Sequence, residues 1–278
     1  MEQAIFLVTS LVGVKKLTFR QKLTTLMNDQ IQITIVLAMI QFDDYQRARS
    51  IIRSQFYPGW VDQINIVTLA SLMADADGVD LADSEQFNTD FESLPSRRFE
   101  VASPIENDTI RYIKDGEIVA EVTEDHNQQP LLKTRFEDHQ PTQAAVYEAG
   151  RQFGLLYFQK GELSQALLLN KNRKMAFRFN RHEQTVNFAY TLGPASKLQF
   201  TELMPDEDEN HHIVYQASEQ RPFYEVVDYS NYDRFDSIYA FYAQLLQNLF
   251  TPVDGLFIDL NDNPKLTPYL PQQLIFNY

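Results

Sequence analysis

Residues 111–122 read RYIKDGEIVAEV, and their two-residue period sets the middle of the chain apart from its ends. Apolar and polar residues alternate on both sides of Asp115 and Gly116, a pair that favours the tight turn of a β-hairpin. Residues 155–163, LLYFQKGEL, repeat the arrangement around a Lys-Gly turn. Sequential hairpins of this kind predict an antiparallel β-meander over residues 96–228. We expect its aromatic residues to form one packed face and its charged residues the other.

The residues before the meander alternate between strand and helix signals. Continuous apolar runs at 4–8, 31–37 and 64–69 predict strands that are covered on both faces. Apolar residues at helical spacing between these runs predict two helices, and Asp43 and Asp44 are good N-cap residues for the second. An alternation of strand, helix, strand, helix and strand is typical of a Rossmann-like layer.

The same pattern returns after the meander. Apolar residues within 232–250 predict a well-buried helix, and residues 255–260 and 273–278 predict two more strands. Residues 74–88 are acidic and small, and we expect them to form a mobile linker.

The predicted fold class is therefore α/β, a Rossmann-like parallel sheet interrupted by a large antiparallel β-meander insertion. Residues 1–95 and 229–278 are expected to form the Rossmann-like layer, and residues 96–228 the insertion. No run approaches the ~18–20 apolar residues of a membrane span, and the N-terminus does not read as an export signal. We expect a cytoplasmic protein.

Composition excludes several functional classes. The 278 residues contain no cysteine, which excludes a disulfide-stapled scaffold and a thiolate-bound metal. A net charge of -14 argues against a nucleic-acid partner, because phosphate affinity requires clustered Lys and Arg. A hydrophobic content of 44% is enough for a large core and argues against global disorder.

The first strand-to-helix loop holds the candidate cleft residues, Ser10, Gly13, Lys15 and Lys16. One glycine is little for a loop that must bring its backbone close to a phosphate. The sequence has none of the glycine-rich phosphate-binding motifs and no nucleophile-elbow setting for Ser10. The two lysines can meet an anion, although surface lysines at a helix start are the favoured interpretation.

Other polar motifs have equally simple explanations. The Asp-Ala-Asp at 75–77 resembles a metal-binding tripeptide of some sugar transferases, but it lies in the expected linker. The histidines at 211–212 follow the acidic run 206–209 and can bind a divalent cation weakly, although a solvated loop is favoured. Trp60 can stack on a sugar or anchor its loop. We expect no metal site.

The order of these parts resembles the N-terminal half of bacterial GT-B glycosyltransferases, which are built from two Rossmann domains. The family includes sugar transferases that act on the poly(glycerol-phosphate) of wall teichoic acid. It also includes the transferase and chaperone subunits that glycosylate serine-rich adhesins of the accessory Sec system. The segments that carry the resemblance lie at residues 5–10, 33–45, 64–69, 111–122, 156–163, 235–250 and 256–259.

The resemblance implies that this chain supplies one wall of a two-domain cleft. Active members usually carry a glycine pair in the first loop, where this chain has only Gly13. The residues that hold the nucleotide sugar belong to the family's second domain, which would follow about where this sequence stops. The resemblance therefore implies no catalytic residue and no cofactor in this chain, with a UDP-sugar bound only if a second domain or subunit is supplied. Whether the chain is an enzyme stays open.

Three functions remain open. The first is a glycosyltransferase-related module for acceptor or partner binding in bacterial surface-protein or teichoic-acid glycosylation. The second is a non-enzymatic accessory or chaperone subunit for glycosylation and export of serine-rich adhesins. The third is a self-contained sugar-modifying enzyme in which two of Glu117, Glu121, Glu124 and Glu137 act as acid and base, although solvated edge charges are the favoured interpretation.

The resemblance also implies assembly. In the family the meander mediates oligomerisation and binds the acceptor polypeptide or teichoic-acid polymer. An exposed meander edge supports such pairing through its unpaired backbone groups. We therefore expect a homo-oligomer or a hetero-complex with a glycosyltransferase subunit, and a peripheral position at a membrane is left open.

Overall fold

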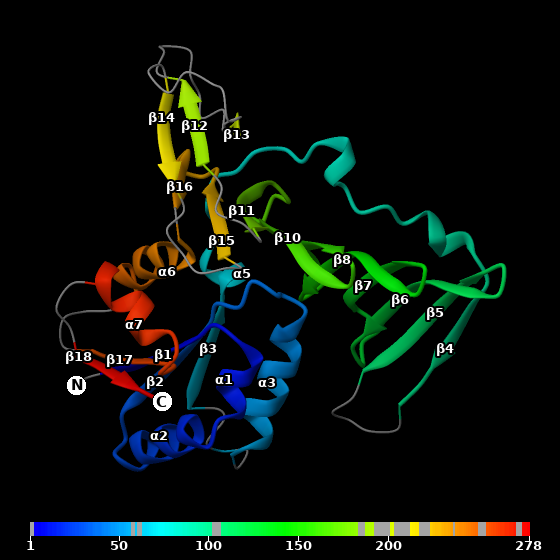
Figure 1. The fold of residues 1–278 in the computed structure, drawn as a ribbon. Helices are drawn as coiled ribbons and strands as arrows, with labels where there is room; N and C mark the ends of the chain where they lie inside the picture. The colour runs from blue at the N-terminus through cyan, green and yellow to red at the C-terminus, as the bar shows by residue number, and fades with distance from the viewer. Residues whose placement is uncertain are drawn as a thin grey trace.

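The computed structural model describes residues 3–56, 59, 63–101, 107–182, 187–191, 201–202, 212–216, 223–235, 237–249, 254–270 and 274–278. Its described strands form a five-stranded parallel sheet, a ten-stranded antiparallel sheet and a three-stranded sheet (Figure 1). The predicted fold class is confirmed, because the long antiparallel region lies between the third and fourth parallel strands of the chain. None of the described helices is long and apolar enough to span a bilayer.

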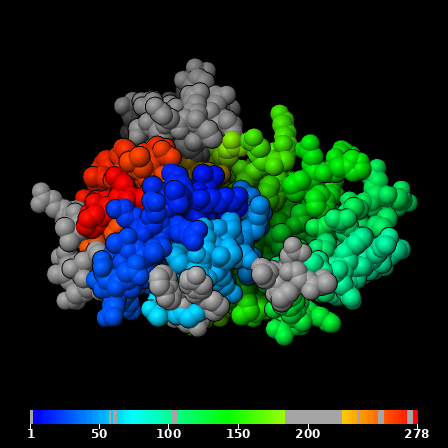
Figure 2. Space-filling view, turned by 90° about the horizontal axis from the view of Figure 1, so that it is seen from below, coloured from blue at the N-terminus to red at the C-terminus, as the bar shows by residue number. Residues whose placement is uncertain are grey.

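The parallel sheet has the order β18-β17-β1-β2-β3, and each neighbouring pair is parallel. Its strands are β1 (Gln3–Val8), β2 (Gln32–Leu37), β3 (Ile64–Thr68), β17 (Gly255–Ile258) and β18 (Leu274–Asn277). All three strands predicted before the meander and both predicted after it are present. Figure 2 shows the first and last parts of the chain packed against each other, as this strand order requires.

Helices lie on both sides of the parallel sheet (Figure 1). They are α1 (Leu11–Lys15), α2 (Leu17–Asn28), α3 (Asp44–Ser54), α5 (Leu69–Leu72), α6 (Ile238–Gln247) and α7 (Asn263–Leu266). In Figure 1, α2 and α3 lie on one side of the sheet and α6 lies on the other. The sheet is therefore covered on both faces, which explains why its strands are continuously apolar.

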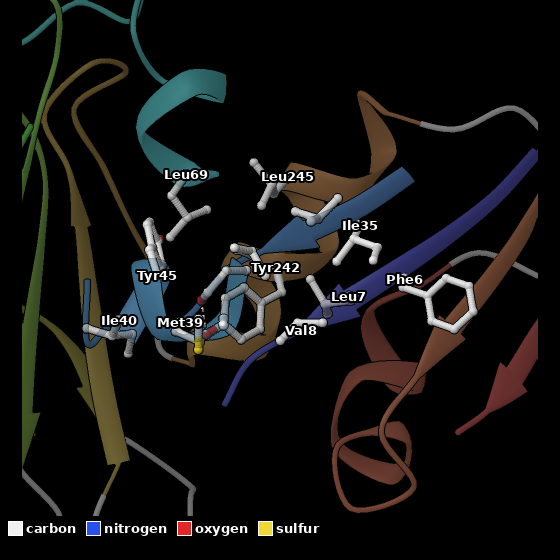
Figure 3. Close-up of a cluster of buried hydrophobic side chains, with 14 of the residues drawn as sticks. Phe6, Leu7, Val8, Ile35, Met39, Ile40, Tyr45, Leu69, Tyr242 and Leu245 are labelled. Atoms are coloured by element: carbon white, nitrogen blue, oxygen red, sulfur yellow. Dashed lines mark hydrogen bonds between the residues drawn. The ribbon is translucent and has the colours of Figure 1, made fainter. Parts of the chain in front are cut away.

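Tyr242 of α6 shows how this core is closed. Its ring lies near Leu7, Val8 and Met39 beside the parallel strands (Figure 3). The buried hydroxyl donates a hydrogen bond of 2.8 Å to the carbonyl oxygen of Ala38. Because a buried hydroxyl without a partner is costly, this bond makes a tyrosine acceptable in an otherwise apolar layer.

The antiparallel sheet has the order β16-β15-β11-β10-β9-β8-β7-β6-β5-β4. Its strands are β4 (Ser96–Phe99), β5 (Asp108–Lys114), β6 (Glu117–Glu124), β7 (Pro130–Glu137), β8 (Gln140–Glu148), β9 (Arg151–Gln159), β10 (Glu162–Leu169), β11 (Met175–His182), β15 (Phe223–Asp228) and β16 (Asp233–Phe235). Both predicted hairpin turns are confirmed, with positive φ at Asp115, Gly116, Lys160 and Gly161.

The meander is not sequential throughout, which corrects the expectation of one continuous series of hairpins. Strand β11 pairs with β15, so the intervening strands leave the large sheet. They are β12 (Asn187–Thr191), β13 (Thr201–Glu202) and β14 (His212–Gln216), and they form the separate three-stranded sheet.

The expected mobile linker is also wrong, because residues 75–94 pack on the antiparallel sheet. Val79 and Met175 exchange two backbone hydrogen bonds of 3.0 and 2.8 Å. The Tyr157 hydroxyl donates a bond of 2.6 Å to the carbonyl oxygen of Glu85. Two short 3₁₀ turns, Asp83–Glu85 and Asp90–Ser93, continue the segment. Its acidic composition reflects an exposed outer side, and not freedom of the backbone.

This docked segment also corrects the expectation of one packed and one charged face. Leu155, Leu167 and Met175 point to the face covered by residues 79–87 and form a second apolar cluster there. Leu156 and Leu168, on the same strands, belong to the main core that is shared with the parallel sheet. The central strands are therefore apolar on both faces.

Two local expectations near the ends of helices need correction. The helix predicted over 232–250 begins at Ile238, because Asp233–Phe235 pairs with β15 as a strand. Ser237 caps the N-terminus of the helix by accepting a hydrogen bond of 3.1 Å from the backbone N–H of Tyr239. Gly13, expected in a loop, lies inside the short helix α1.

Phe42, in the segment after β2, joins the two large sheets. Its ring lies 5.8 Å from the ring of Phe153 and 6.1 Å from that of Phe179, both on the antiparallel sheet. A side-chain carbon at Gly154 would approach the Phe42 ring to 2.6 Å, a distance that Cβ atoms do not adopt. A glycine at position 154 is therefore what lets the two sheets approach each other so closely.

Candidate functional site

A crevice of about 520 Å³ opens at the carboxyl ends of β1, β2 and β17. From β1 the chain order runs through β2 to β3 on one side and through β17 to β18 on the other. The order therefore reverses between β1 and β17. In open parallel sheets, ligands bind outside the carboxyl ends of the strands at such a switch point. The first turn of α6 and Tyr224 of β15 complete the lining.

Asp259 follows directly after β17 and forms the base of the crevice. It is 5% exposed, and its Oδ1 accepts a hydrogen bond of 2.6 Å from the Nζ of Lys16. The same oxygen accepts a bond of 2.9 Å from the backbone N–H of Asn261. A buried carboxylate needs both a counter-charge and hydrogen bonds, and this arrangement supplies them.

Asp262 ties three elements together at one wall of the crevice. Its Oδ1 accepts a hydrogen bond of 3.0 Å from the hydroxyl of Tyr239 in α6. Its Oδ2 accepts from the hydroxyl of Thr9, which follows β1. Both carboxylate oxygens of Asp262 are therefore engaged in holding the crevice in shape.

Asp44, in the first turn of α3, also lines the crevice, and its carboxylate is less engaged. The nearest ion-pair contact is the guanidinium of Arg47 at 3.8 Å, and among the described residues no side chain donates a hydrogen bond to the Asp44 carboxylate. Burial raises the pKa of this carboxyl, and the charges of Arg47 and Lys15 partly oppose that rise. Asp44 therefore keeps hydrogen-bond acceptors free within the crevice.

The four residues singled out from the sequence lie close together, but in different roles. Ser10 caps α1 by accepting a bond of 3.3 Å from the backbone N–H of Gly13, and it lines the crevice. Lys16 lines it too, paired with Asp259. Gly13 is buried beneath it, and Lys15 is exposed outside the lining. Lys16 and the N-terminus of α1 do not form a binding site for a diphosphate, because the charge of Lys16 is neutralised by Asp259 and α1 has five residues.

The remaining sequence candidates lie elsewhere. Asp75 forms an exposed ion pair of 2.5 Å with Lys171. Glu121 and Glu124 pair across strands with Arg111 and Arg98, and all four glutamates proposed as acid or base lie outside the crevice lining. The tryptophan at 60 and residues 206–211 lie outside the described residues. Within the part of the chain that the structure describes, no three His, Asp or Glu side chains gather where they could hold a metal ion.

Sequence reasoning missed Asp44, Asp259, Asp262 and Tyr239. A usable signal was present for Asp44 and Asp262, since each follows the carboxyl end of a predicted parallel strand, whereas Asp259 falls inside the strand predicted over 255–260. Tyr239 has no such signal, because its role depends on where α6 crosses the sheet.

The fold and the crevice define an α/β protein with a ligand-type cleft at a strand-order reversal. No protein-family model and no curated protein matches the chain. Solved structures do match. The accessory secretory protein 1, 2 and 3 structure from Streptococcus pneumoniae has a TM-score of 0.52 at 10% identity, covering 99% of this chain and 51% of that one.

Two further structures are similar. The Glycosylation Associate Protein (Gap123) complex from Streptococcus agalactiae has a TM-score of 0.50 at 10% identity, covering 99% of this chain and 50% of that one. TarM from S. aureus has a TM-score of 0.47 at 9% identity, covering 100% and 50%. This chain spans about half the length of the chains it matches. The resemblance in fold expected from the order of elements is confirmed.

Proposed function

We propose that this chain is a glycosyltransferase-related module that binds an acceptor or a partner in bacterial surface-protein or teichoic-acid glycosylation. The observation that carries the proposal is the crevice at the strand-order reversal, in a fold shared with about half of each matching chain. The crevice is the acceptor site in this proposal. Its carboxylates and its tyrosine suit hydroxyl groups, which both donate and accept hydrogen bonds.

In this proposal the chain alone does not transfer sugar. A departing nucleotide diphosphate needs positive groups arranged around it in the transition state. Among the described residues that line the crevice, the one cation, Lys16, is bound to Asp259 at 2.6 Å, and Asp44 and Asp262 add negative charge. A UDP-sugar would therefore be held by a second domain or another subunit.

A second candidate is a non-enzymatic accessory subunit for glycosylation and export of serine-rich adhesins. The observation that favours it is the kind of structure matched, since the structures matched at TM-scores of 0.52 and 0.50 carry names of several-component assemblies, accessory secretory protein 1, 2 and 3 and Gap123. This favours a hetero-complex for the chain under this candidate. Under this candidate the crevice holds the polypeptide without chemistry on it.

Titration calorimetry of the purified full chain tests the proposal. Its injectants are a serine-rich polypeptide, poly(glycerol phosphate), UDP-glucose and UDP-N-acetylglucosamine. We expect binding of one of the two polymers and no heat from either UDP-sugar. Loss of polymer binding in Tyr239→Phe, which removes the hydroxyl that donates to Asp262, would place the acceptor in the crevice. The exposed Tyr232→Phe is the matched control. Turnover of a UDP-sugar by this chain alone, or failure of both polymers to bind, overturns the proposal.

A further inference from the structure

A second cavity, of about 380 Å³, lies between the docked segment and the antiparallel sheet. It is lined by Asp80, Leu81, Gln86, Phe87, Gln152 and Arg173, and it shares no lining residue with the crevice. Gln152 belongs to β9, and Arg173 lies in the turn between β10 and β11. The volume is in the range of small-molecule sites, roughly 300–1,000 Å³.

A β-bulge turns Gln152 towards this cavity. Val146 of β8 pairs with Gly154 of β9. The next residue of β8, Tyr147, pairs with Gln152, so Phe153 is an extra residue in β9. Paired residues share one face of an antiparallel sheet, and Tyr147 packs on the second apolar cluster, beneath the docked segment. A bulge therefore places a polar side chain, 7% exposed, on the covered face, and bulges often re-aim side chains in this way next to functional sites.

Arg173 and Gln152 hold each other in place. A terminal N–H of the Arg173 guanidinium donates a hydrogen bond of 3.1 Å to the Oε1 of Gln152. The Gln152 amide nitrogen and the other guanidinium N–H groups have no acceptor among the described residues. The turn that carries Arg173 is itself fixed, because the Oδ1 of Asn170 accepts bonds of 2.9 and 3.0 Å from the backbone N–H groups of Asn172 and Lys174. The free donors are therefore presented from a defined position.

Arg173 also differs from the other cations near the cavity, because no described carboxylate forms an ion pair with it. The neighbouring charges are matched, as the ion pairs Lys174–Asp80, Lys171–Asp75 and Arg178–Glu85 and, on the other face of β9, as Arg151 opposite Glu148. Asp80, which lines the cavity, lies 3.5 Å from the ammonium of Lys174. The charge of Arg173 is thus left to attract an anion.

A carboxylate matches these donors. A guanidinium can donate two parallel N–H bonds to the two carboxylate oxygens, and such charge-assisted bonds are about twice as strong as neutral ones. The amide N–H groups of Gln152 add a further donor. A phosphate dianion fits less well, because its second charge would be repelled by Asp80 on the lining. Leu81 and Phe87, which pack on the second apolar cluster, offer an apolar wall beside these donors.

We propose that this cavity is a binding site for a carboxylate carried on an apolar or aromatic body. Arg173 and Gln152 hold the carboxylate, and Leu81 and Phe87 contact the body. The carboxylate can belong to a small organic acid or to the C-terminus of a peptide. The site is separate from the crevice and does not depend on the function proposed there.

NMR titration of the purified full chain with four probes tests the proposal. The probes are 3-phenylpropionate, its neutral amide 3-phenylpropionamide, phenyl phosphate, and a tripeptide that ends in phenylalanine with a free carboxylate. We expect 3-phenylpropionate, the tripeptide or both to bind about tenfold more tightly than the neutral amide, because the amide cannot accept charge-assisted bonds. The stronger of the two carboxylates identifies the source, a small acid or a peptide terminus.

Two variants assign the binding to this cavity. Arg173→Gln removes the cation, and we expect carboxylate binding to fall about tenfold. Gln152→Glu places a carboxylate of the chain itself against Arg173, and we expect it to abolish binding of the added carboxylate. Arg53→Gln, exposed on α3 and outside the lining, is the matched control and should leave the affinities unchanged. If the buried Gln152→Glu does not fold, the exposed Arg173→Gln decides.

Four results would overturn the proposal. The neutral amide could bind as tightly as the carboxylates, which would remove the role of charge. Phenyl phosphate could bind more tightly than either carboxylate, which would make the site one for phosphate. Carboxylate binding could be the same in Arg173→Gln and in Arg53→Gln, which would place it elsewhere on the chain. Finally, neither carboxylate could bind.

Discussion

The two large sheets bury their residues in opposite ways. In the parallel sheet five of the six residues of β1, and five of the six of β2, are buried. In the antiparallel sheet burial is graded, since β9 is buried over five residues in a row and β4 is exposed throughout. The central strands of the parallel sheet, β1 and β2, are enclosed on both faces, whereas the antiparallel sheet is anchored at its central strands and exposed at β4.

This difference separates two tasks within one molecule. An enclosed sheet fixes the ends of its strands, which is what a ligand crevice needs from its support. A sheet with a free edge offers unpaired backbone groups and exposed side chains to partners. The comparison therefore places the crevice on the rigid part and leaves the β4 edge available for contacts.

Separate unfolding of the two sheets would contradict this comparison most clearly, and a substitution at Phe42 tests for it. Phe42 is fully buried and contacts rings from the antiparallel sheet. We expect Phe42→Ala to lower the free energy of unfolding by about 3–5 kcal/mol, because the core cannot collapse into the cavity. Urea unfolding followed by circular dichroism and by tyrosine fluorescence should show one transition that shifts in both signals.

Phe99→Ala is the matched control for that substitution. Phe99 lies on β4, is 37% exposed, and is flanked by the guanidinium groups of Arg97 and Arg111 at 5.1 and 5.0 Å. We expect a loss of about 1 kcal/mol or less, as for other surface substitutions. Equal effects of the two substitutions, or two separate transitions in the parent chain, would contradict the picture of one anchored sheet.

Asp43, next to Phe42 in the chain, carries a carboxyl whose pKa reports on the burial of this segment. Burial and, to a smaller extent, the charge of Asp44 raise the pKa of its carboxyl from 3.8 to about 6, and its Oδ1 is buried with no hydrogen-bond partner among the described residues. The folded state therefore holds this proton more tightly than the unfolded state does. Stability from this group is present below about pH 4 and is lost as the pH rises to about 6.

Asp43→Asn removes that titration. We expect the variant to be more stable than the parent chain by up to about 3 kcal/mol at pH 7 to 8, since each pKa unit corresponds to about 1.4 kcal/mol. The gain should shrink towards zero at pH 4. Urea unfolding of both proteins at intervals of one pH unit measures the difference, in which all other titrations cancel. A gain in stability that does not change with pH would show that burial does not raise the pKa of Asp43.

The same contrast explains which parts of the fold could be predicted from the sequence. The enclosed strands are continuous apolar runs, and the hairpins carry their turn residues, so both are visible locally. The linker predicted over residues 74–88 was misjudged because its outer side is acidic while its docking depends on a few partners far along the chain, such as Met175 and Tyr157. Local composition records the solvent side and does not record such partners.

Only some of the crevice residues could be predicted from the sequence, for a similar reason. Ser10 and Lys16 were found because they follow the first predicted strand. Asp259 and Asp262 follow the fourth parallel strand, which is separated from the first by the whole antiparallel region. Their closeness to Lys16 depends on β17 pairing with β1, for example Ala4 with Gly255, and pairing so far along the sequence leaves no local pattern in the chain.

The smallest expected effect concerns the docked segment, and it sharpens the distinction between covered and open parts of the antiparallel sheet. Glu85 forms an ion pair with Arg178, and the two side chains are 17% and 23% exposed. We expect Glu85→Gln to cost about 1–2 kcal/mol, between the values for exposed and fully buried pairs, because a half-buried guanidinium loses its counter-charge. Amide hydrogen exchange over residues 79–94 should become faster, while exchange in β1 and β2 stays unchanged.

Asp75→Asn provides the matched control for Glu85→Gln. Asp75 and Lys171 also form an ion pair, but their side chains are 83% and 57% exposed. Water screens such a pair, so we expect no measurable change in stability or in exchange. If Asp75→Asn accelerates exchange as much as Glu85→Gln, the segment is held by its overall negative charge. If neither variant changes exchange, the backbone bonds between Val79 and Met175 and the apolar contacts beneath the segment are sufficient to hold it on the sheet.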